Sequence, residues 1–210
     1  MSHERGDDWL LLIICSPSGA GKTTLKNRLL AARGDLRFSV SHTTRPKRPH
    51  EVDGRDYHFV DRAHFGQMID RGEFAEWAEV HGNRYGTSHA EIELARATHR
   101  GVVFDIDYQG ARQLKASLDG PVTVFVLPPS MGELERRLRS RGDEREESIL
   151  RRLTNARDEI EHYAIFDYVI VNDDLDLAFE ELGAIVAAER TRTRRRARLA
   201  EHMLQNGSIE

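Results

Sequence analysis

The chain has 210 residues, of which 39% are hydrophobic and 31% charged, and its formal net charge is −4. This composition excludes a disordered chain and suits one soluble domain, and the mildly acidic balance disfavours general affinity for nucleic acid or acidic lipid. The apolar runs are much shorter than the ~20 residues that span a bilayer, so no membrane partner is expected. A single cysteine, Cys15, and a polar N-terminus without an apolar signal segment predict a cytoplasmic location.

The first functional signal is a phosphate-binding loop. The apolar run at residues 9–15 predicts a buried strand, residues 16–23 read SPSGAGKT, and Leu25, Leu29 and Leu30 follow at helical spacing. In such a loop, backbone N–H groups surround nucleotide phosphates, the lysine reaches the outer phosphates, and the hydroxyl binds Mg²⁺. Thr23 is therefore the expected Mg²⁺ ligand, and the predicted nucleotide-binding residues are Ser16, Pro17, Ser18, Gly19, Ala20, Gly21, Lys22, Thr23 and Thr24. Ser16 stands where the full pattern has its first glycine.

Strands and helices alternate along the rest of the chain. Apolar, β-branched runs recur at residues 102–106, 122–127 and 168–171, and segments with helical spacing separate them. This alternation predicts an α/β fold with a central parallel sheet covered by helices on both faces. We expect one domain, whose core comprises residues 9–37, 91–132 and 158–190.

Three segments depart from that alternation. Short, partly polar runs at 38–43, 57–60 and 84–88, punctuated by proline and glycine, predict a small, mostly antiparallel insertion over residues 38–90. Arginines and acids at helical spacing around Gly142 predict two helices and an exposed turn over residues 133–157. The last segment, residues 191–210, forms a basic tail.

The insertion also holds a second candidate phosphate site. Residues 39–48 read SVSHTTRPKR and bring hydroxyls, a lysine and the arginines Arg45 and Arg48 into one turn. Guanidinium groups match phosphate oxygens two at a time, and Tyr57 adds a phenolic donor. This composition predicts that a second phosphate group binds opposite the loop.

Longer motifs then identify a family. In this order the chain contains SVSHTTRPKR, DGRDYHF, FAEW, NRYGTS, FDIDYQG, SRGDEREESILRRL and VIVNDD, and it resembles guanylate kinase from about residue 9 to 190. The resemblance implies a P-loop kinase three-layer fold, a GMP-binding insertion and a helical lid. It also implies Mg²⁺-dependent transfer of a phosphoryl group from ATP to GMP, with dGMP as a further acceptor, in purine nucleotide metabolism.

The resemblance also implies roles for single residues. The expected GMP-binding residues are Ser41, Arg45, Arg48, Tyr57, Glu76, Tyr85, Thr87 and Asp105. The expected catalytic residues are Lys22, Arg45, Arg137, Arg141 and Arg152, and Asn172 matches a residue near the adenine of ATP. Glu76 is the specificity residue, because a carboxylate accepts from the guanine N1–H and 2-amino group, a donor pair that adenine lacks.

Plainer interpretations stand beside these. The loop could be a ligand-free turn, Glu76 a solvated acid, and the lid arginines an ion-pair face, as we expect for Arg139, Arg145 and Arg151. An inactive interaction module and a ribose 1,5-bisphosphate phosphokinase are the alternative functions. The run 190–198 carries six arginines and is expected to be the solvated end of the last helix. Contact with nucleic acid or an acidic partner is the alternative for that run.

Overall fold

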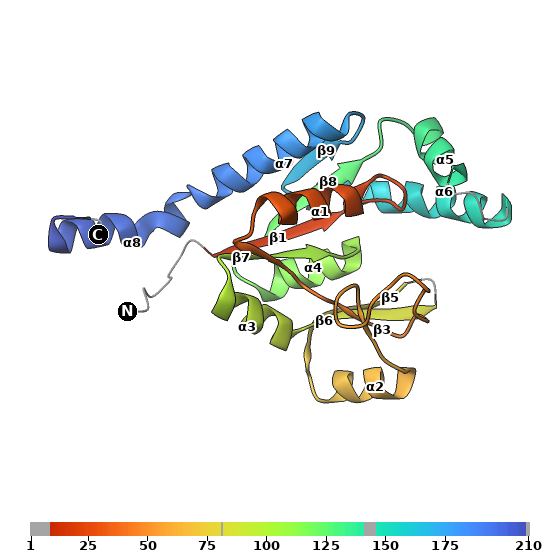
Figure 1. Ribbon diagram of the computed structural model, residues 1–210, viewed down its shortest axis with the longest axis horizontal. Coiled ribbons are helices and arrows are strands. Elements are labelled where there is room, and N and C mark those ends of the chain that lie inside the picture. The colour runs from red at the N-terminus through yellow and green to blue at the C-terminus, as the bar shows by residue number, and fades with distance from the viewer. Residues whose placement is uncertain (1–8, 81, 141–145, 209–210) are drawn as a thin grey trace.

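A five-stranded parallel sheet forms the centre of the molecule (Figure 1). The computed structural model describes residues 9–80, 82–140 and 146–208. The strand order is β2-β7-β1-β8-β9, and the strands are β1 (Leu10–Cys15), β2 (Leu36–Phe38), β7 (Gly101–Asp105), β8 (Val122–Leu127) and β9 (Tyr168–Val171). Every residue of β1 is buried, as expected for the middle strand of a sheet covered on both faces. The predicted α/β fold with a parallel sheet is thus confirmed.

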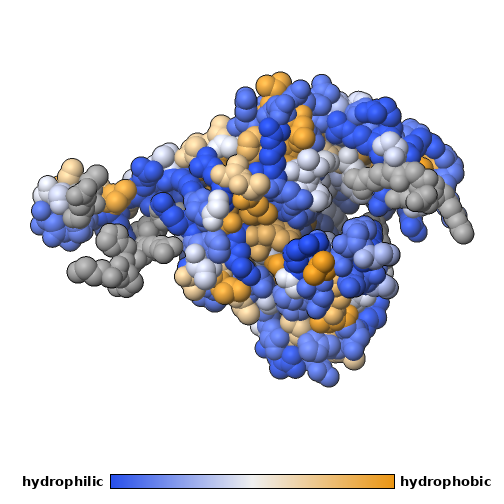
Figure 2. Space-filling model, viewed as in Figure 1, coloured by the Kyte–Doolittle hydropathy of each residue, from blue (hydrophilic) through white to orange (hydrophobic). Residues whose placement is uncertain are grey.

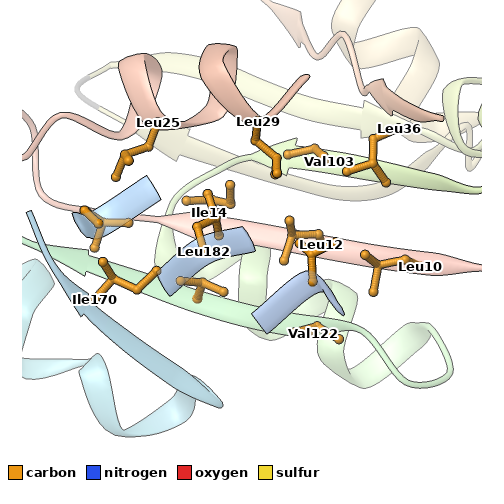
Figure 3. Packing of buried hydrophobic residues seen from close by; sticks show 14 residues of the cluster. Leu10, Leu12, Ile14, Leu25, Leu29, Leu36, Val103, Val122, Ile170 and Leu182 are labelled. Atoms are coloured by element: carbon orange, nitrogen blue, oxygen red, sulfur yellow. The ribbon is translucent and has the colours of Figure 1, made fainter. Parts of the chain in front are cut away.

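Helices cover both faces of this sheet. One apolar cluster joins alternate residues of β1, such as Leu12 and Ile14, to Leu25, Leu29 and Leu182 (Figure 3). That face is covered by α1 (Lys22–Ala32) and α7 (Leu175–Arg190), and the opposite face by α3 (His89–Thr98) and α4 (Tyr108–Ser117). Cys15 belongs to the second cluster, where its Sγ donates to the Ile106 carbonyl at 2.9 Å. Burial raises the pKa of this thiol, which agrees with a packing role.

The insertion is a second sheet beside the core. Its order is β4-β3-β6-β5, with two antiparallel pairs and one parallel pair. Its elements are β3 (His42–Thr43), β4 (His58–Phe59), α2 (Arg62–Asp70), β5 (Phe74–Val80) and β6 (Asn83–Ser88). The mostly antiparallel character is confirmed. The run 38–43 is not one strand of the insertion, because Phe38 ends β2 of the main sheet and only His42 and Thr43 pair in the second.

The lid consists of two helices with their own apolar contacts. They are α5 (Met131–Arg139) and α6 (Glu146–Glu161), and Leu134, Leu138, Ile149 and Ala156 pack between them. The predicted turn at Gly142 lies outside the described residues. A short 3-10 helix, η1 (Tyr163–Ile165), leads from α6 into β9. Hydrophilic residues cover much of the surface over the lid and insertion (Figure 2).

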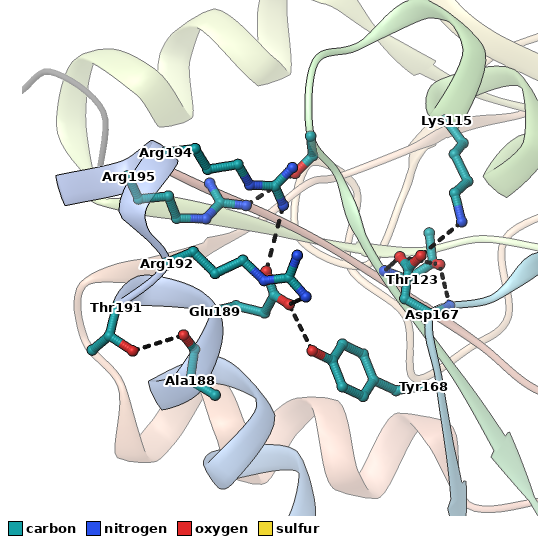
Figure 4. A network of polar contacts seen from close by, with 11 residues as sticks. Lys115, Thr123, Asp167, Tyr168, Ala188, Glu189, Thr191, Arg192, Arg194 and Arg195 are labelled. Atoms are coloured by element: carbon teal, nitrogen blue, oxygen red, sulfur yellow. Dashed lines mark hydrogen bonds and ion pairs between the residues drawn. The ribbon is translucent and has the colours of Figure 1, made fainter. Parts of the chain in front are cut away.

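The basic C-terminal run is more than a solvated helix end. After α7 the chain forms a separate helix, α8 (Thr193–Asn206), which projects from the core (Figure 1). Arg195 is buried and donates to the carbonyls of Trp9 and Gly120, and buried Glu189 pairs with Arg192 and Arg194 (Figure 4). These arginines serve to attach α8 to the domain, a role that the charge pattern alone did not reveal. No helix among the described residues is long and apolar enough to cross a membrane.

Candidate active site

A cavity of about 790 Å³ lies where the phosphate-binding loop, the insertion and the lid meet. The predicted loop residues line it, except for buried Ala20. The predicted acceptor residues that line it are Ser41, Arg45, Arg48, Tyr57, Glu76, Tyr85 and Asp105. Thr87 is fully buried, and Asn172 is buried without lining the cavity. Both predicted sites therefore open into the same space.

The loop between β1 and α1 owes its shape to two glycines. Gly19 and Gly21 have φ values of 99° and 94°, a region in which side chains with a Cβ are strained. The Ala20 N–H donates to the Pro17 carbonyl at 3.1 Å and closes the turn. The hydroxyl of Ser16, the residue that replaces the first glycine of the motif, donates to the Pro17 carbonyl at 3.0 Å. The N-terminus of α1 follows directly and presents Thr23 and Thr24 to the cavity.

Lys22 already has an anionic partner. Its Nζ lies 2.7 Å from Asp105 Oδ1, and Lys26 Nζ lies 3.2 Å from Oδ2 of the same carboxylate. Burial disfavours the charge on Lys22, but Asp105 raises the net pKa of this amine above its ordinary value. Burial likewise disfavours the charge on Asp105, yet the two lysines hold the pKa of its carboxyl below its usual range. Asp105, predicted to bind GMP, thus contacts the loop lysine at the end of β7.

The arginines of the insertion are held in place by an acid that the sequence analysis did not single out. Glu51 is buried and accepts from Arg45 through both oxygens, at 2.6 and 3.1 Å, and from the Arg48 backbone N–H at 2.8 Å. The hydrogen bond from Arg45 is the main reason that the pKa of Glu51 lies below its usual value. The Arg45 guanidinium also lies 5.3 Å from the centre of the Tyr57 ring. These contacts hold the Arg45 guanidinium against Tyr57 and the Arg48 backbone in place at the wall of the cavity.

Glu76 is a buried carboxylate that faces the cavity. Its side chain comes from β5, opposite Thr87 of β6, and the residue is 4% exposed. Its Oε1 and the Thr87 hydroxyl have no hydrogen-bond partner in the described part of the chain. Burial raises the pKa of Glu76 to about 7, although Thr87 pulls the pKa the other way. Because buried polar atoms are nearly always paired, the Glu76 carboxylate at the cavity wall is a candidate acceptor for a donor of a bound molecule.

The three predicted arginines of the lid occupy different places. Arg152 of α6 lines the cavity. Arg137 of α5 donates to Glu133 at 2.7 Å and to the Asn172 carbonyl at 3.0 Å, and it does not line the cavity. Arg141 lies outside the described residues, as does Arg145. Arg139 pairs with Glu135 and Glu146, as expected of the ion-pair face.

Comparison with known proteins agrees with this geometry. The family model described as guanylate kinase matches residues 10–189. This chain belongs to the guanylate kinase family. It is 53% identical over 182 residues to a guanylate kinase of Aromatoleum aromaticum, covering 87% of this chain and 89% of the relative. A guanylate kinase of Cereibacter sphaeroides is 52% identical over 204 residues, covering 96% and 97% of the two chains.

A solved structure supports the same family assignment. The crystal structure of guanylate kinase from Anaplasma phagocytophilum superimposes with a TM-score of 0.78 at 35% sequence identity, and each chain is covered to 96%. The likeness therefore includes α8, which follows the part matched by the family model. Both the curated relatives and this structure are matched over nearly their whole length.

A second residue of this guanylate kinase family site was missed in the sequence. Glu159, near the end of α6, lines the cavity on the same face of the helix as Arg152, which lies seven residues earlier, about two turns away. Burial raises the pKa of Glu159 to about 7, while nearby Lys22 and the Ser18 backbone N–H lower it. The lid helix thus brings one cation and one acid to the cavity. Only the folded chain reveals this, because in the sequence Glu159 is one of many acids at helical spacing.

Proposed function

We propose that this protein transfers the γ-phosphoryl group of ATP to GMP and forms ADP and GDP. The observation that carries the proposal is one cavity lined by a phosphate-binding loop and also by two arginines and a buried carboxylate, one oxygen of which has no partner among the described residues. The loop suits a nucleoside triphosphate. The arginines and the carboxylate suit a smaller molecule that has one phosphate and a base with adjacent donors. GMP has both features.

The acceptor binds at the insertion. Arg45 and Arg48 hold the GMP phosphate with the help of Ser41, Tyr57 and Tyr85, and cationic forks fit its oxygens. Glu76 accepts from guanine N1–H and the 2-amino group, and Thr87 contributes its buried hydroxyl beside it. An adenine or pyrimidine ring would leave the Glu76 carboxylate unpaired in a buried place. The energetic cost of that mismatch is the basis of selectivity.

The reaction itself needs little proton transfer. A GMP phosphate oxygen forms a bond to the γ-phosphorus as the bond from that phosphorus to the β,γ-bridging oxygen of ATP breaks, and ADP leaves. A phosphate monoester has its second pKa near 6, so the attacking group is largely dianionic at neutral pH and no general base is required. Lys22 exchanges Asp105 for the ATP phosphates. Arg152, with Arg137 and Arg141 on lid closure, stabilises the charge that spreads over the transferring group.

The residue that would hold Mg²⁺ is Thr23, whose hydroxyl is presented to the cavity at the start of α1 and is the oxygen type that Mg²⁺ prefers. Asp105 and Asp107 also line the cavity, but both Asp105 oxygens contact lysines. Among the described residues there is no group of three His, Cys, Asp or Glu placed to hold a metal alone. That agrees with an ion bound mainly through nucleotide phosphates. When bound, Mg²⁺ neutralises charge on the transferring phosphates.

The test is an acceptor panel. ADP formation from ATP with Mg²⁺ is measured with GMP, dGMP, AMP, CMP, UMP and ribose 1,5-bisphosphate supplied separately. We expect rapid turnover with the guanine nucleotides and little with the others. Turnover with the ribose bisphosphate would reassign the acceptor. Binding of GMP and ATP without any turnover would instead indicate an inactive interaction module.

A further inference from the structure

The side chain of Asn172 lies behind the phosphate-binding loop. Its Nδ2 donates to the Ala20 carbonyl at 2.7 Å, and the residue is 5% exposed. Its backbone N–H donates to the Leu127 carbonyl at 2.8 Å, so the end of the β8–β9 pair holds it in place. The Asn172 Nδ2 thus contacts the loop backbone, and the residue does not line the cavity.

The neighbouring glycine makes this contact possible. A Cβ added to Gly21 would lie only 2.1 Å from Asn172 Nδ2, so the amide occupies the place of a side chain there. The positive φ of Gly21, 94°, gives the loop its turn at the same point. Asn172 therefore contacts the Ala20–Gly21 peptide unit, one residue before Lys22, the residue expected to reach the outer phosphates of ATP.

The other end of Asn172 reaches the lid. Its backbone carbonyl accepts from Arg137 Nη2 at 3.0 Å, and Glu133 holds the Nε of the same arginine at 2.7 Å. The phosphate-binding loop also contacts α5 directly. A Cβ added to Gly19 of the loop would lie only 2.9 Å from Leu134 Cδ1 of α5. The loop and α5 are therefore packed together at Gly19 and linked through Asn172.

We infer that Asn172 is a positioning residue that braces the phosphate-binding loop and joins it to α5, and that it acts on the phosphates of ATP independently of the base. This inference rests on the proposed function, because it concerns the ATP side of the same cavity. Removing the Asn172 donor from this buried hydrogen bond costs free energy, because the Ala20 carbonyl is then left without a partner. Loosening the loop weakens every ligand that depends on its N–H groups. A contact with adenine would affect ATP alone.

The test substitutes Asn172→Asp, which keeps the size of the side chain but places a carboxylate oxygen against the Ala20 carbonyl. Dissociation constants are measured by calorimetry for ATP, GTP and inorganic tripolyphosphate, and separately for GMP. We expect the three triphosphate ligands to lose affinity by a similar factor of about ten. GMP affinity should change little, while the melting temperature should fall by a few degrees because the buried Ala20 carbonyl loses its donor. The matched control is Asn206→Asp, the same change on the exposed face of α8.

Loss of ATP affinity with unchanged tripolyphosphate affinity would overturn the inference and assign Asn172 to the base. Equal affinities in variant and wild type would also overturn it. If Asn172→Asp does not fold, Asn172→Ala decides by the same comparison, because it removes the donor without adding a charge. A wild-type protein that binds no ATP would contradict the proposed function instead, so the two failures are distinguishable.

Discussion

The two halves of the cavity are built in different ways. On the donor side, backbone groups of the loop form the site, and buried contacts to Asn172, Leu134 and Leu138 hold them. On the acceptor side, side chains form the site: Arg45 is clamped by Glu51, while Glu76 keeps an oxygen without a partner among the described residues. A backbone cradle fits any triphosphate, whereas a buried acid requires particular donors. We therefore expect selectivity for the base to reside in the acceptor half and the donor half to bind the triphosphate whatever its base.

Lys22→Ala should have the largest effect on activity, because it removes the cation expected to contact the outer phosphates of ATP. We expect the turnover number with saturating ATP and GMP to fall by about a thousandfold. The dissociation constant of GMP should change far less than the turnover number, because Lys22 affects GMP only through its contact with Asp105. Steady-state kinetics and a separate GMP titration measure the two quantities. Lys115→Ala, which breaks an ion pair with Asp167 away from the cavity, is the control. Near-normal GDP formation by Lys22→Ala would contradict the division of roles.

Glu76→Gln tests the acceptor half. The variant keeps the shape but replaces one acceptor oxygen by a donor group, so guanine loses a charged partner in a buried place. We expect kcat/KM for GMP to fall roughly a hundredfold while ATP affinity is unchanged. Glu79→Gln, on an exposed position of the same strand, should leave both unchanged. An equal loss for ATP and GMP would remove Glu76 from the guanine site.

The pH dependence of GMP binding sharpens the same comparison. With a pKa raised by burial to about 7, the Glu76 carboxyl is mostly ionised at pH 8 and mostly protonated at pH 6. GMP affinity should therefore fall about tenfold from pH 8 to pH 6 through the protonation of Glu76 alone. The GMP phosphate also titrates in this range. The pH dependence of GMP affinity is therefore compared between wild type and Glu76→Gln, because the variant keeps the phosphate contribution and lacks that of Glu76. Identical pH profiles of the two proteins would contradict this assignment.

The same pKa has a consequence for stability. The folded pKa is raised above the unfolded value, so protonation of Glu76 favours folding. Its stabilising contribution is present below about pH 4.5 and is lost as pH rises to about 7. Without GMP, the free energy of unfolding of wild type should thus decline relative to Glu76→Gln across this window. Saturating GMP at higher pH should offset the decline, since the ligand supplies the missing donors.

The sequence predicts the two halves of the cavity to different extents, depending on whether the residues that act together are close or distant in the chain. The loop could be located from the sequence because its residues are contiguous, from Ser16 to Thr24, and all of them except Ala20 line the cavity. Glu51 and Glu159 were missed because their partners are set by folding: Glu51 turns back onto Arg45, and Glu159 reaches the loop from α6. Strand β2 was not predicted, and Phe38 was assigned to the insertion, since an edge strand of three residues with a polar middle residue has no clear periodicity. The buried role of Arg195 could not be predicted, because a run of arginines gives no sign of which one meets buried carbonyl partners.

Gly110→Ala should give the smallest effect, and it tests whether the position of Glu76 is set by its neighbour. Gly110 lies in the first turn of α4, and a Cβ there would lie 2.6 Å from Glu76 Oε2. Helix propensity alone favours alanine over glycine by about 1 kcal/mol. The added methyl group, however, displaces the carboxylate from its preferred geometry. An off-rotamer side chain costs about 1 kcal/mol, so the KM for GMP should rise about fivefold.

The matched control is Gly183→Ala in α7, where an added Cβ meets nothing within 4 Å. It should raise the free energy of unfolding by about 1 kcal/mol and leave the KM for GMP unchanged, because only helix propensity is altered. The affinity for ATP should stay the same in both variants, since neither position touches the donor half. If Gly110→Ala behaves like Gly183→Ala, the Glu76 carboxylate has room to move without loss of GMP. In that case, selectivity depends on the charge of Glu76 and not on its fixed position.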